Sequence, residues 1–419
     1  MGKIKAEKRK RNNRKTLIAT VDIGKSTNSG YWRCPDGTDA KPFEFFNNGR
    51  GFATFCHRII QAQKAYDLDE IVVGFESTGV YGEPLVHYLR KRPVRLVQVN
   101  PMHTKRLKEL QGNSPQKTDQ KDPKVIADII ELGHALTLVV PEGASAELRR
   151  LTHGRERCMK RRTALLNQLR DLAFVIFPEF VQVMKGMRSK SARFILRHYP
   201  TPQSIARCGL ESMTAILKKV SRGRLGEERA LALYEGAINS VGVIEGRESI
   251  LLEIREILSA LEATEHFIAD LEEHMSGYLK EIPYSRSILS LKGIGEITAA
   301  GLIGEVGDFR KFATISEMMK LAGLNLFEIS SGEHKGKRRI SKRGRPLLRK
   351  LLYFATLNVV RKGGVMHEVY QSYLQRGMIK MKALIAVARK LLRIIFALVR
   401  DRSEYIEEHS TIQNLKEAA

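Results

Sequence analysis

The sequence has little cysteine, and its cysteines are not grouped. Only four occur in 419 residues, and no two form a Cys-x-x-Cys pair. A disulfide framework or a zinc ribbon needs such grouping, so the sequence argues against both. We therefore expect a protein of a reducing compartment, the cytoplasm. The four are Cys34, Cys56, Cys158 and Cys208.

Long apolar runs are also missing. No stretch of 18 apolar residues occurs, and the most apolar late segment, residues 383–400, is interrupted by Arg389, Lys390 and Arg393. Residues 1–15 carry eight Lys or Arg and one Glu, with no apolar segment after them. We therefore expect neither a transmembrane helix nor a signal peptide, and no membrane partner.

Acidic residues are in deficit. The chain has 71 Lys plus Arg against 46 Asp plus Glu, a formal net charge of +25. Such an excess suits a long polyanion such as nucleic acid, because each neutralised phosphate releases counterions. A basic protein of crowded assemblies or of anionic membranes is the alternative. Residues 1–15 are interpreted as a disordered basic arm.

Residues 16–140 alternate strand and helix patterns. Buried strands are expected at residues 16–24, 70–76 and 94–100, and a hairpin around the turn Pro-Asp-Gly-Thr-Asp. Helices are expected at 50–66, 79–92 and 122–132. Strands that alternate with helices indicate an α/β fold with a mixed sheet.

Residues 145–282 are expected to be helical, with two series at alternating steps of three and four that are typical of a coiled coil. The two series can pair as an antiparallel hairpin within one chain or between chains. The clearer series is Ile250, Ile254, Ile257, Leu261, Thr264, Ile268, Leu271, Met275 and Tyr278. The weaker series is Leu148, Leu151, Arg155, Cys158, Arg162, Leu165, Leu169 and Leu172. A third, mostly helical region spans 283–400, and 401–419 is a polar tail.

Carboxylates mark the expected carboxyl ends of two strands. Asp22 lies in the first strand and Glu76 at the end of the second, and strand ends of an open α/β sheet face its ligand crevice. Asp119 and Asp122, three residues apart, stand at the start of a helix, and Asp128 follows. Such acids form a hard, oxygen-lined site for two Mg²⁺ ions beside a phosphodiester. In the alternatives, Asp122 is a helix cap, Glu76 a solvated loop acid, or Asp-x-Gly opens a sugar-kinase-type nucleotide domain.

Two glycine-containing segments of the third region suggest nucleic-acid contact. Gly293 and Gly295, between two apolar helical segments, have the form of a helix-hairpin-helix turn that presents backbone N–H groups to a phosphate. A tight turn between packed helices is the alternative. A cationic run follows, without acids, and is predicted to contact phosphates. Its members include Lys335, Lys337, Arg338, Arg339, Lys342, Arg343 and Arg345.

A serine beside a glycine precedes this run. Ser330-Ser331-Gly332 offers a nucleophile, although Ser-Gly is also a common turn. Neither Gly-x-Ser-x-Gly nor a Walker motif occurs, which argues against a serine hydrolase and against an ATP-driven enzyme.

Taken in order, these motifs resemble the DEDD transposases of bacterial insertion sequences, known as family one-ten. The resemblance covers about residues 16–400. The matching motifs are Val21-Asp22-Ile23-Gly24, Glu76-Ser77-Thr78-Gly79, Lys117-Thr118-Asp119-x-x-Asp122, Gly293-Ile294-Gly295, Ala322-Gly323-Leu324, Ser331-Gly332 and Ile340-Ser341-Lys342-x-Gly344. The family commonly has Pro where this chain has Leu326.

The resemblance implies an RNase-H-fold domain of RuvC type, joined by a coiled coil to a C-terminal transposase domain. It implies that Asp22, Glu76, Asp119 and Asp122 bind Mg²⁺ and that Ser331 becomes joined to DNA, although the serine doublet keeps Ser330 open. It further implies a structured bridge RNA that pairs with donor and target DNA.

We expect an RNA-guided recombinase that forms a covalent phosphoserine intermediate and assembles as a dimer or tetramer through the coiled coil. It would associate with the nucleoid when it acts. One alternative is a RuvC-like junction nuclease that uses a metal-activated water without a covalent step. The other is a non-catalytic nucleic-acid-binding scaffold.

Overall fold

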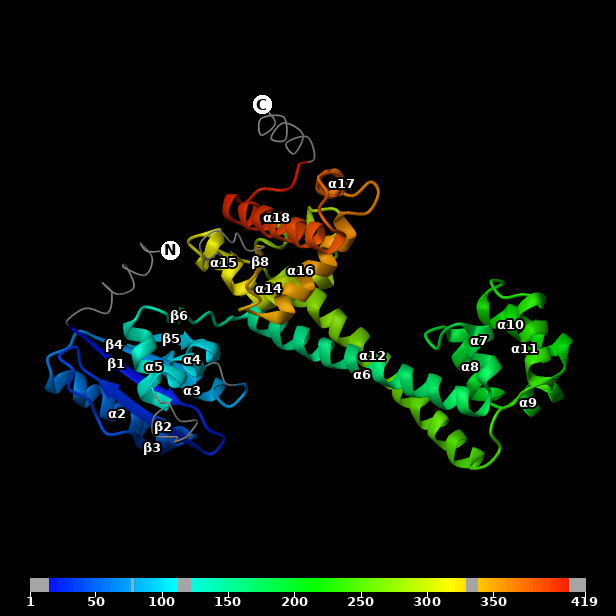
Figure 1. Ribbon diagram of the computed structural model, residues 1–419, viewed down its shortest axis with the longest axis horizontal. Helices are drawn as coiled ribbons and strands as arrows, with labels where there is room; N and C mark the ends of the chain where they lie inside the picture. The colour runs from blue at the N-terminus through cyan, green and yellow to red at the C-terminus, as the bar shows by residue number, and fades with distance from the viewer. Residues whose placement is uncertain (1–14, 77–78, 112–121, 329–337, 407–419) are drawn as a thin grey trace. The chain divides into compact units, whose positions relative to one another are not determined.

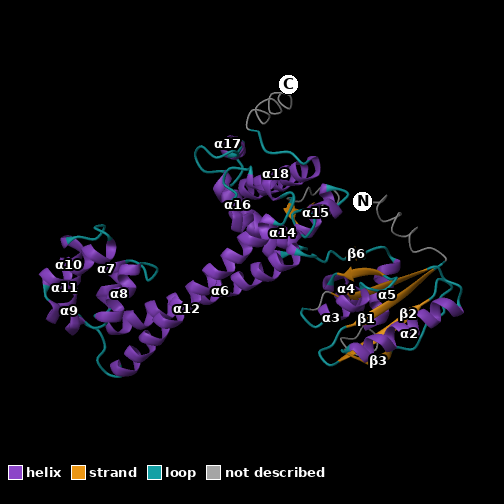
Figure 2. Ribbon diagram, turned by 180° about the vertical axis from the view of Figure 1, so that it is seen from behind, coloured by secondary structure: helices purple, strands orange, loops and turns teal. Residues whose placement is uncertain are grey.

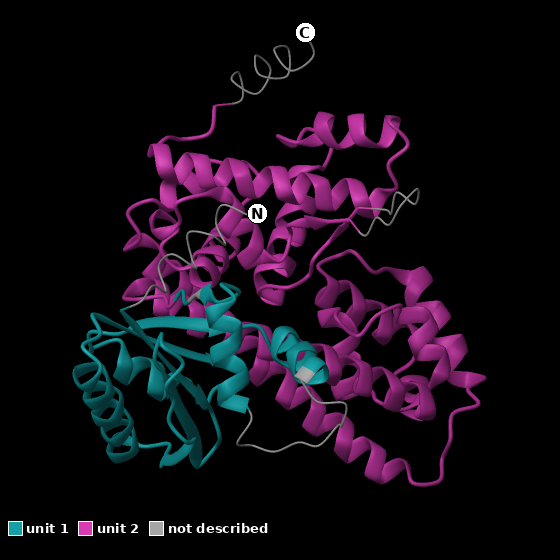
Figure 3. Cartoon of the chain, turned by 60° about the vertical axis from the view of Figure 1, so that its left-hand side comes forward, with its two compact units in different colours: residues 1–139 teal, residues 140–419 magenta. Residues whose placement is uncertain are grey.

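The computed structural model describes residues 15–76, 79–111, 122–328 and 338–406. The chain divides into two compact units, residues 1–139 and 140–419 (Figure 3). The first is an α/β unit, and the second is almost entirely helical within the described ranges. The predicted fold class, an α/β region followed by a mostly helical remainder, is confirmed at this level. The finer division at residue 283 stays a prediction.

The first unit is built on a six-stranded mixed sheet in the order β3-β2-β1-β4-β5-β6. Strands β1, β2 and β3 form antiparallel pairs, and β1, β4 and β5 run parallel. The short β6, which the sequence did not predict, pairs antiparallel with β5. The strands span Thr16–Asp22 (β1), Thr27–Arg33 (β2), Phe43–Phe46 (β3), Glu70–Glu76 (β4), Arg95–Val99 (β5) and Leu136–Thr137 (β6).

Both faces of the central strands are buried. Leu17, Ala19 and Val21 of β1 belong to the apolar core that contains residues of α2 and α3, whereas Ile18 belongs to the core that contains α5. This two-sided burial explains why β1 and β4 are continuously apolar rather than alternating. The helices of this unit span Gly49–Ala65 (α2), Glu83–Leu89 (α3), Pro101–Gln111 (α4) and Asp122–Glu131 (α5).

In the second unit, two long helices pack along each other within one chain (Figure 1). They are α6 (Ala144–Ile176) and α12 (Arg247–Lys280). Ion pairs Arg155–Glu272, at 2.6 Å, and Arg162–Glu265, at 3.0 Å, show that the helices run antiparallel. Of the two arrangements that the sequence allowed, the chain adopts the hairpin.

The buried face of α12 differs from the predicted series at three positions. Leu251, Leu258 and Leu279 are buried, whereas their neighbours Ile250, Ile257 and Tyr278 are half-buried. The shift arises because α12 packs against further helices as well as α6, so its apolar face is wider than a two-helix seam. Thr264 is the polar member, and its hydroxyl donates to the Ala260 carbonyl at 2.6 Å, so it is satisfied within the helix.

Five short helices lie between the long ones and share an apolar core with the ends of α6 and α12 that adjoin them. They span Pro178–Met184 (α7), Lys190–His198 (α8), Pro202–Cys208 (α9), Leu210–Ser221 (α10) and Glu227–Ile238 (α11). Prolines stand at the first turn of α7 and α9, where the missing N–H costs nothing.

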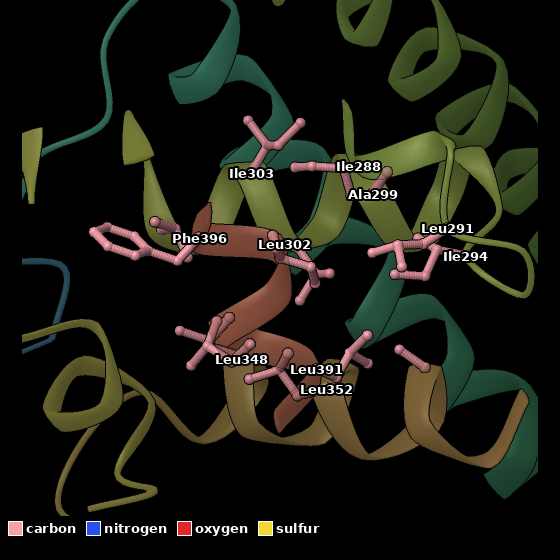
Figure 4. Close-up of a cluster of buried hydrophobic side chains, with 14 of the residues drawn as sticks. Ile288, Leu291, Ile294, Ala299, Leu302, Ile303, Leu348, Leu352, Leu391 and Phe396 are labelled. Atoms are coloured by element: carbon pink, nitrogen blue, oxygen red, sulfur yellow. The ribbon is translucent and has the colours of Figure 1, made fainter. Parts of the chain in front are cut away.

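The remaining elements pack around the hydrophobic helix α14 (Figure 4). A Cβ on Gly304 of α14 would lie 2.7 Å from the backbone nitrogen of Arg149, so glycine permits α14 to approach α6 closely. The elements span Ser285–Leu289 (α13), Glu296–Val306 (α14), Phe309–Lys311 (η1), Ile315–Ala322 (α15), Leu326–Phe327 (β7), Arg339–Ile340 (β8), Pro346–Val359 (α16), His367–Gln375 (α17) and Lys380–Asp401 (α18) (Figure 2).

Within the described ranges, every helix is too short or too polar to cross a membrane.

Candidate functional site

Asp22 and Glu76 end two neighbouring parallel strands. In the register of β1 and β4, Val21 lies opposite Phe75, so the next residue of each strand is an acid. Adjacent strands are about 4.8 Å apart, which places the two carboxylates side by side at the carboxyl edge of the sheet. Both residues are half-buried.

The two acids share the face of the sheet that α5 covers. Side chains alternate along a strand, so Asp22 lies on the side of Thr20 and Glu76 on the side of Gly74. A Cβ on Gly74 would lie 2.2 Å from Cδ1 of Ile130 in α5, which identifies this face. The missing side chain of Gly74 therefore lets α5 approach the strand one step before the second acid.

The first residue of α5 is Asp122, the third predicted acid. The buried Thr20 hydroxyl donates a 2.7 Å hydrogen bond to the carbonyl of Pro123, the residue after Asp122. This bond ties the start of α5 to β1 two residues before Asp22. The Asp122 carboxylate also pairs with Lys108 Nζ of α4 at 2.5 Å, a partner that sequence reasoning missed.

Two asparagines hold the loops that follow the strand acids. Asn47 Nδ2 donates to the carbonyls of Gly24, at 3.0 Å, and of Tyr81, at 3.1 Å, and so joins the loop after Asp22 to the loop after Glu76. Asn28 accepts from the Gly24 amide at 3.1 Å. Sequence reasoning missed both, because no motif distinguishes them from other polar residues near a hairpin.

The fourth predicted acid, Asp119, lies outside the described residues. Across the described ranges, no group of three or more acids, histidines or cysteines is close enough to hold a metal ion together. Asp128, further along α5, pairs with Arg33 Nη1 at 2.7 Å and so has a structural partner. The described acids at the sheet edge are therefore a pair, Asp22 with Glu76, and Asp122 on the adjoining helix.

In the second unit, the predicted helix-hairpin-helix turn joins α13 to α14. Gly293 has a positive φ of 100°, which favours glycine, and Gly295 is the residue before the first turn of α14. Both glycines are exposed, while Ile294 between them is buried in the core. The turn therefore serves helix packing through Ile294 and leaves backbone near a helix N-terminus accessible.

Two motif segments that are far apart in the sequence pack on each other. A Cβ on Gly344 would lie 2.4 Å from the Leu321 carbonyl oxygen and 2.5 Å from the Gly323 nitrogen. Ser341 Oγ donates to Asn325 Oδ1 at 2.5 Å, and the Lys342 amide donates to the Gly323 carbonyl at 2.9 Å. Both segments therefore need small residues for backbone contact.

These segments support the hairpin of β7 and β8, in which Leu326 pairs with Ile340. Just beyond the strands, Glu328 and Arg338 form an ion pair at 2.8 Å. The chain between these two residues carries Ser330, Ser331, Lys335 and Lys337, all outside the described residues. The Glu328–Arg338 ion pair therefore holds the two ends of this segment close together beside the β7–β8 hairpin.

The described members of the cationic run differ in their surroundings. Arg339, Lys342 and Arg343 are exposed. Arg345 is half-buried, its guanidinium donates to the Glu305 carbonyl, and burial lowers its pKa to about 10. Three of these four cations are therefore exposed, whereas Arg345 is held inside the protein.

Glu305 is a buried acid that sequence reasoning missed. Its carboxylate accepts from Arg149 at 3.0 Å and lies 2.8 Å from His153 Nε2, both on α6. Burial raises the pKa of Glu305, but the His153 hydrogen bond and the Arg149 charge outweigh it, so the pKa lies below its ordinary value. The available signal was an acid within the otherwise uncharged stretch that follows the first residue of α14.

Comparison with known proteins gives two family models that together match more than half of the chain. One, described as a transposase and built for DEDD transposases of the IS110 type, matches residues 19–178. The other, described as "Transposase IS116/IS110/IS902 family", matches residues 285–371.

Individual relatives agree with these models. The chain is 21% identical over 388 residues to "Insertion element IS110 uncharacterized 43.6 kDa protein" of Streptomyces coelicolor, covering 92% of this chain and 94% of the relative. It is 25% identical to "Insertion element IS116 uncharacterized 44.8 kDa protein" of Streptomyces clavuligerus, over 68% and 72%. It is 27% identical to "Transposase for insertion sequence element IS1111A" of Coxiella burnetii, over 47% and 57%.

Proposed function

The chain belongs to the IS110/IS116 family of transposases, and from this premise we propose that four acids and one serine carry out the cutting and rejoining of DNA. The observation that carries the proposal is the juxtaposition of Asp22 and Glu76 at the ends of parallel strands, beside the helix that begins with Asp122. Asp119 would complete the set from the segment before that helix.

The donor chemistry suits Mg²⁺, because Asp22, Glu76 and Asp122 offer carboxylate oxygens, the ligands that this ion prefers. The three do not form one metal cluster in the described residues, so the proposal has Mg²⁺ held by the neighbouring pair Asp22 and Glu76, with Asp122 and Asp119 approaching on binding. When bound, Mg²⁺ would polarise the phosphoryl oxygens and lower the pKa of an attacking hydroxyl. The residues of the chain fix the acids: Thr20 holds the start of α5, and Asn47 ties the two loops together. An RNase-H-type fold of the RuvC kind fits the strand order and is part of the proposal.

The serine would act as a nucleophile on phosphorus. In the proposed step, Ser331 Oγ loses its proton to a base and forms a bond to the phosphorus atom, while the scissile P–O bond breaks and the leaving DNA hydroxyl takes up a proton. Rejoining reverses the step with a different DNA hydroxyl. One phosphate ester replaces another, so no ATP is required.

A guide RNA and several subunits complete the proposal. Pairing between a structured bridge RNA and DNA would supply the choice of sequence. The protein would contact the nucleic-acid backbones through the exposed cations Arg339, Lys342 and Arg343 and through its own backbone at Gly293 and Gly295. Lys335 and Lys337, outside the described residues, would add to these contacts.

Strand exchange needs more than one active site, so we propose a homo-oligomer, a dimer or tetramer, that acts on the bacterial nucleoid. Ser330 remains the alternative nucleophile.

The test is to trap the reaction. Supercoiled donor, target and the RNA that copurifies with the protein are incubated with Mg²⁺, and any protein–DNA adduct is mapped by mass spectrometry. We expect the adduct on Ser331 and its loss in Ser331→Ala. An adduct on Ser330 reassigns the nucleophile. Recombination without an adduct rejects the covalent step, and strand breakage that persists in Ser331→Ala favours a nuclease with an activated water.

The acids are tested separately. Asp22→Asn should abolish cleavage and leave nucleic-acid binding nearly unchanged. The matched control is Asp67→Asn, an exposed acid of the same unit whose positive φ of 48° asparagine tolerates well. Loss of cleavage, binding and thermal stability together in Asp22→Asn alone would assign Asp22 to the fold rather than to the chemistry.

A further inference from the structure

Helix α18 carries a line of cations opposite its buried face. Four lysines and arginines of this helix follow one another at intervals of seven, four and seven residues. These intervals correspond to almost two turns, about one turn and almost two turns of an α-helix. Ala386 and Ala397 lie beside this line on one flank. At 1.5 Å per residue the line is about 27 Å long. Its members, called the α18 stripe below, are Lys382, Arg389, Arg393 and Arg400.

The stripe is almost free of compensating acids. The only acid in α18 is Asp401, which pairs with Arg400 at 2.7 Å. Within the described ranges, Lys382, Arg389 and Arg393 form no ion pair. Three cations of one line are therefore uncompensated, on a helix that is anchored in the core by ten buried residues.

Arg389 differs from the other members of the stripe in its surroundings. It is half-buried, because α17 lies against α18 (Figures 1 and 2). Its Nε is buried and has no hydrogen-bond partner in the described part of the chain. Burial, followed by the charge of Arg393 one turn further along, lowers the pKa of Arg389, while Tyr373 of α17 acts in the opposite direction. A solvated surface cation would lose none of its hydration, whereas this one has lost part of it without a partner.

We propose that the α18 stripe binds the phosphodiester backbone of nucleic acid, with Arg389 and Arg393 on one phosphate group. An anion between these two guanidinium groups would remove the repulsion between them, and an outward turn of the Arg389 guanidinium would bring its now buried Nε to the anion. A polyanion fits better than a single anion, since Lys382 and Arg400 extend the line in both directions. An anionic membrane fits less well, because Met381 is the one large apolar side chain that α18 leaves exposed.

The proposal rests on the action of the chain on nucleic acid but not on its cutting chemistry. DNA and guide RNA present the same backbone, so the experiment has one arm for each. Binding is measured by fluorescence anisotropy in EDTA, with a 30-base-pair DNA duplex and with an RNA hairpin of similar size. Without metal no cleavage occurs, so failure here leaves the acid and serine assignments untouched.

The variant is Arg389→Met with Arg393→Gln, which keeps the packed stem of Arg389. The control is Arg170→Gln with Arg310→Gln, which removes the same charge from two arginines already paired with Asp171 and Asp308. We expect the slope of log affinity against log salt to fall by about one in the stripe variant, because the two arginines share one phosphate and each phosphate contact contributes close to one. The control should keep the slope.

Arg389→Met alone provides a second readout. Because the uncompensated buried cation destabilises the free protein, its removal should raise the Tm while binding weakens. A loss of slope in one arm only identifies the nucleic acid that occupies the stripe. Equal losses in the stripe and control variants, or a lower Tm together with unchanged binding, overturn the proposal.

Discussion

Thr20 donates its hydroxyl hydrogen bond to the carbonyl of Pro123, 103 residues away in the sequence. The bond joins the strand that ends in Asp22 to the helix that begins with Asp122. Both atoms are buried, so the bond has no competition from water. This contact between a strand and a helix N-terminus therefore helps to fix the relative position of two proposed metal-binding acids, together with the apolar packing of α5 on the sheet.

Thr20→Val removes this bond while keeping the shape of the side chain. The Pro123 carbonyl would remain buried without its donor, so we expect a loss of about 1–3 kcal/mol in the free energy of unfolding and reduced DNA cleavage. Urea denaturation and a cleavage assay measure the two effects. Thr54→Val is the control, because the Thr54 hydroxyl bonds the Arg50 carbonyl on an exposed helix surface. Equal effects in both variants would contradict the role assigned to Thr20.

Asn47→Ala frees the loops after Asp22 and Glu76 from each other. We expect Mg²⁺-dependent cleavage to fall by about 10–100-fold, the usual cost of removing a group that orients metal ligands, with a small change in Tm. The reduction should be partly reversed at higher Mg²⁺, which a titration of cleavage rate against metal concentration measures. Asn239→Ala, which removes a bond within an exposed turn, should leave the rate unchanged. An unchanged cleavage rate in Asn47→Ala would show that Asn47 does not orient the metal-binding acids.

Glu305→Gln leaves Arg149 and Arg345 close together without an acid between them. Removal of one partner of a buried ion pair costs about 3–5 kcal/mol, so the variant should be much less stable at pH 7. Because the pKa of Glu305 is lowered in the folded protein, its stabilisation is complete above the ordinary value near 4.5 and is lost as the pH falls below it. The difference in Tm between wild type and variant should therefore shrink below pH 4.5.

Thermal unfolding between pH 3 and pH 7 measures this effect. Glu142→Gln is the matched control, since Glu142 forms an exposed pair with Lys311 and should change the Tm little at any pH. A difference for Glu305→Gln that stays constant down to pH 3 would contradict the lowered pKa.

Gly344→Ala introduces a methyl group into the contact between the two motif segments of the second unit. The new Cβ would lie within 2.6 Å of three backbone atoms, so the backbone has to move. We expect a lower Tm and strongly reduced adduct formation, because the hairpin next to the serine segment shifts. Gly277→Ala, at an exposed position of α12 with no atom near the new Cβ, should raise the Tm slightly. Unchanged adduct formation in Gly344→Ala would show that this contact does not position the serine segment.

Local patterns predicted much of the first unit. The β-branched run at 70–76 is strand β4 residue for residue, and the proline after Asp122 stands at the start of α5 as expected. The two-residue strand β6 was not predicted, because so short a strand has no periodicity and exists only through pairing with β5. The helix α4 was missed as well, in a polar stretch that gives a weak pattern.

For the candidate site, too, local patterns marked the residues, whereas the tertiary structure determined which of them are neighbours. The residues themselves, Asp22 and Glu76, are marked by carboxylates at the end of apolar strands, a local signal. That they are neighbours depends on the parallel pairing of β1 with β4, across 54 residues of chain. Lys108, Asn47 and Glu305 acquire their partners only through packing, so no local pattern distinguished them.

The sequence by itself predicted an α/β region followed by helices, the resemblance to a transposase family and the candidate acids and serine, because strand and helix periodicity, charge and motif order are local properties of the chain. Only the tertiary structure decided that α6 pairs with α12 in the same chain, that Gly323 and Gly344 meet, and that Arg345 turns inward. It also left Nε of Arg389 without a hydrogen-bond partner among the described residues. These outcomes depend on close packing between distant segments, where the space and the charge at one residue are set by others far along the chain.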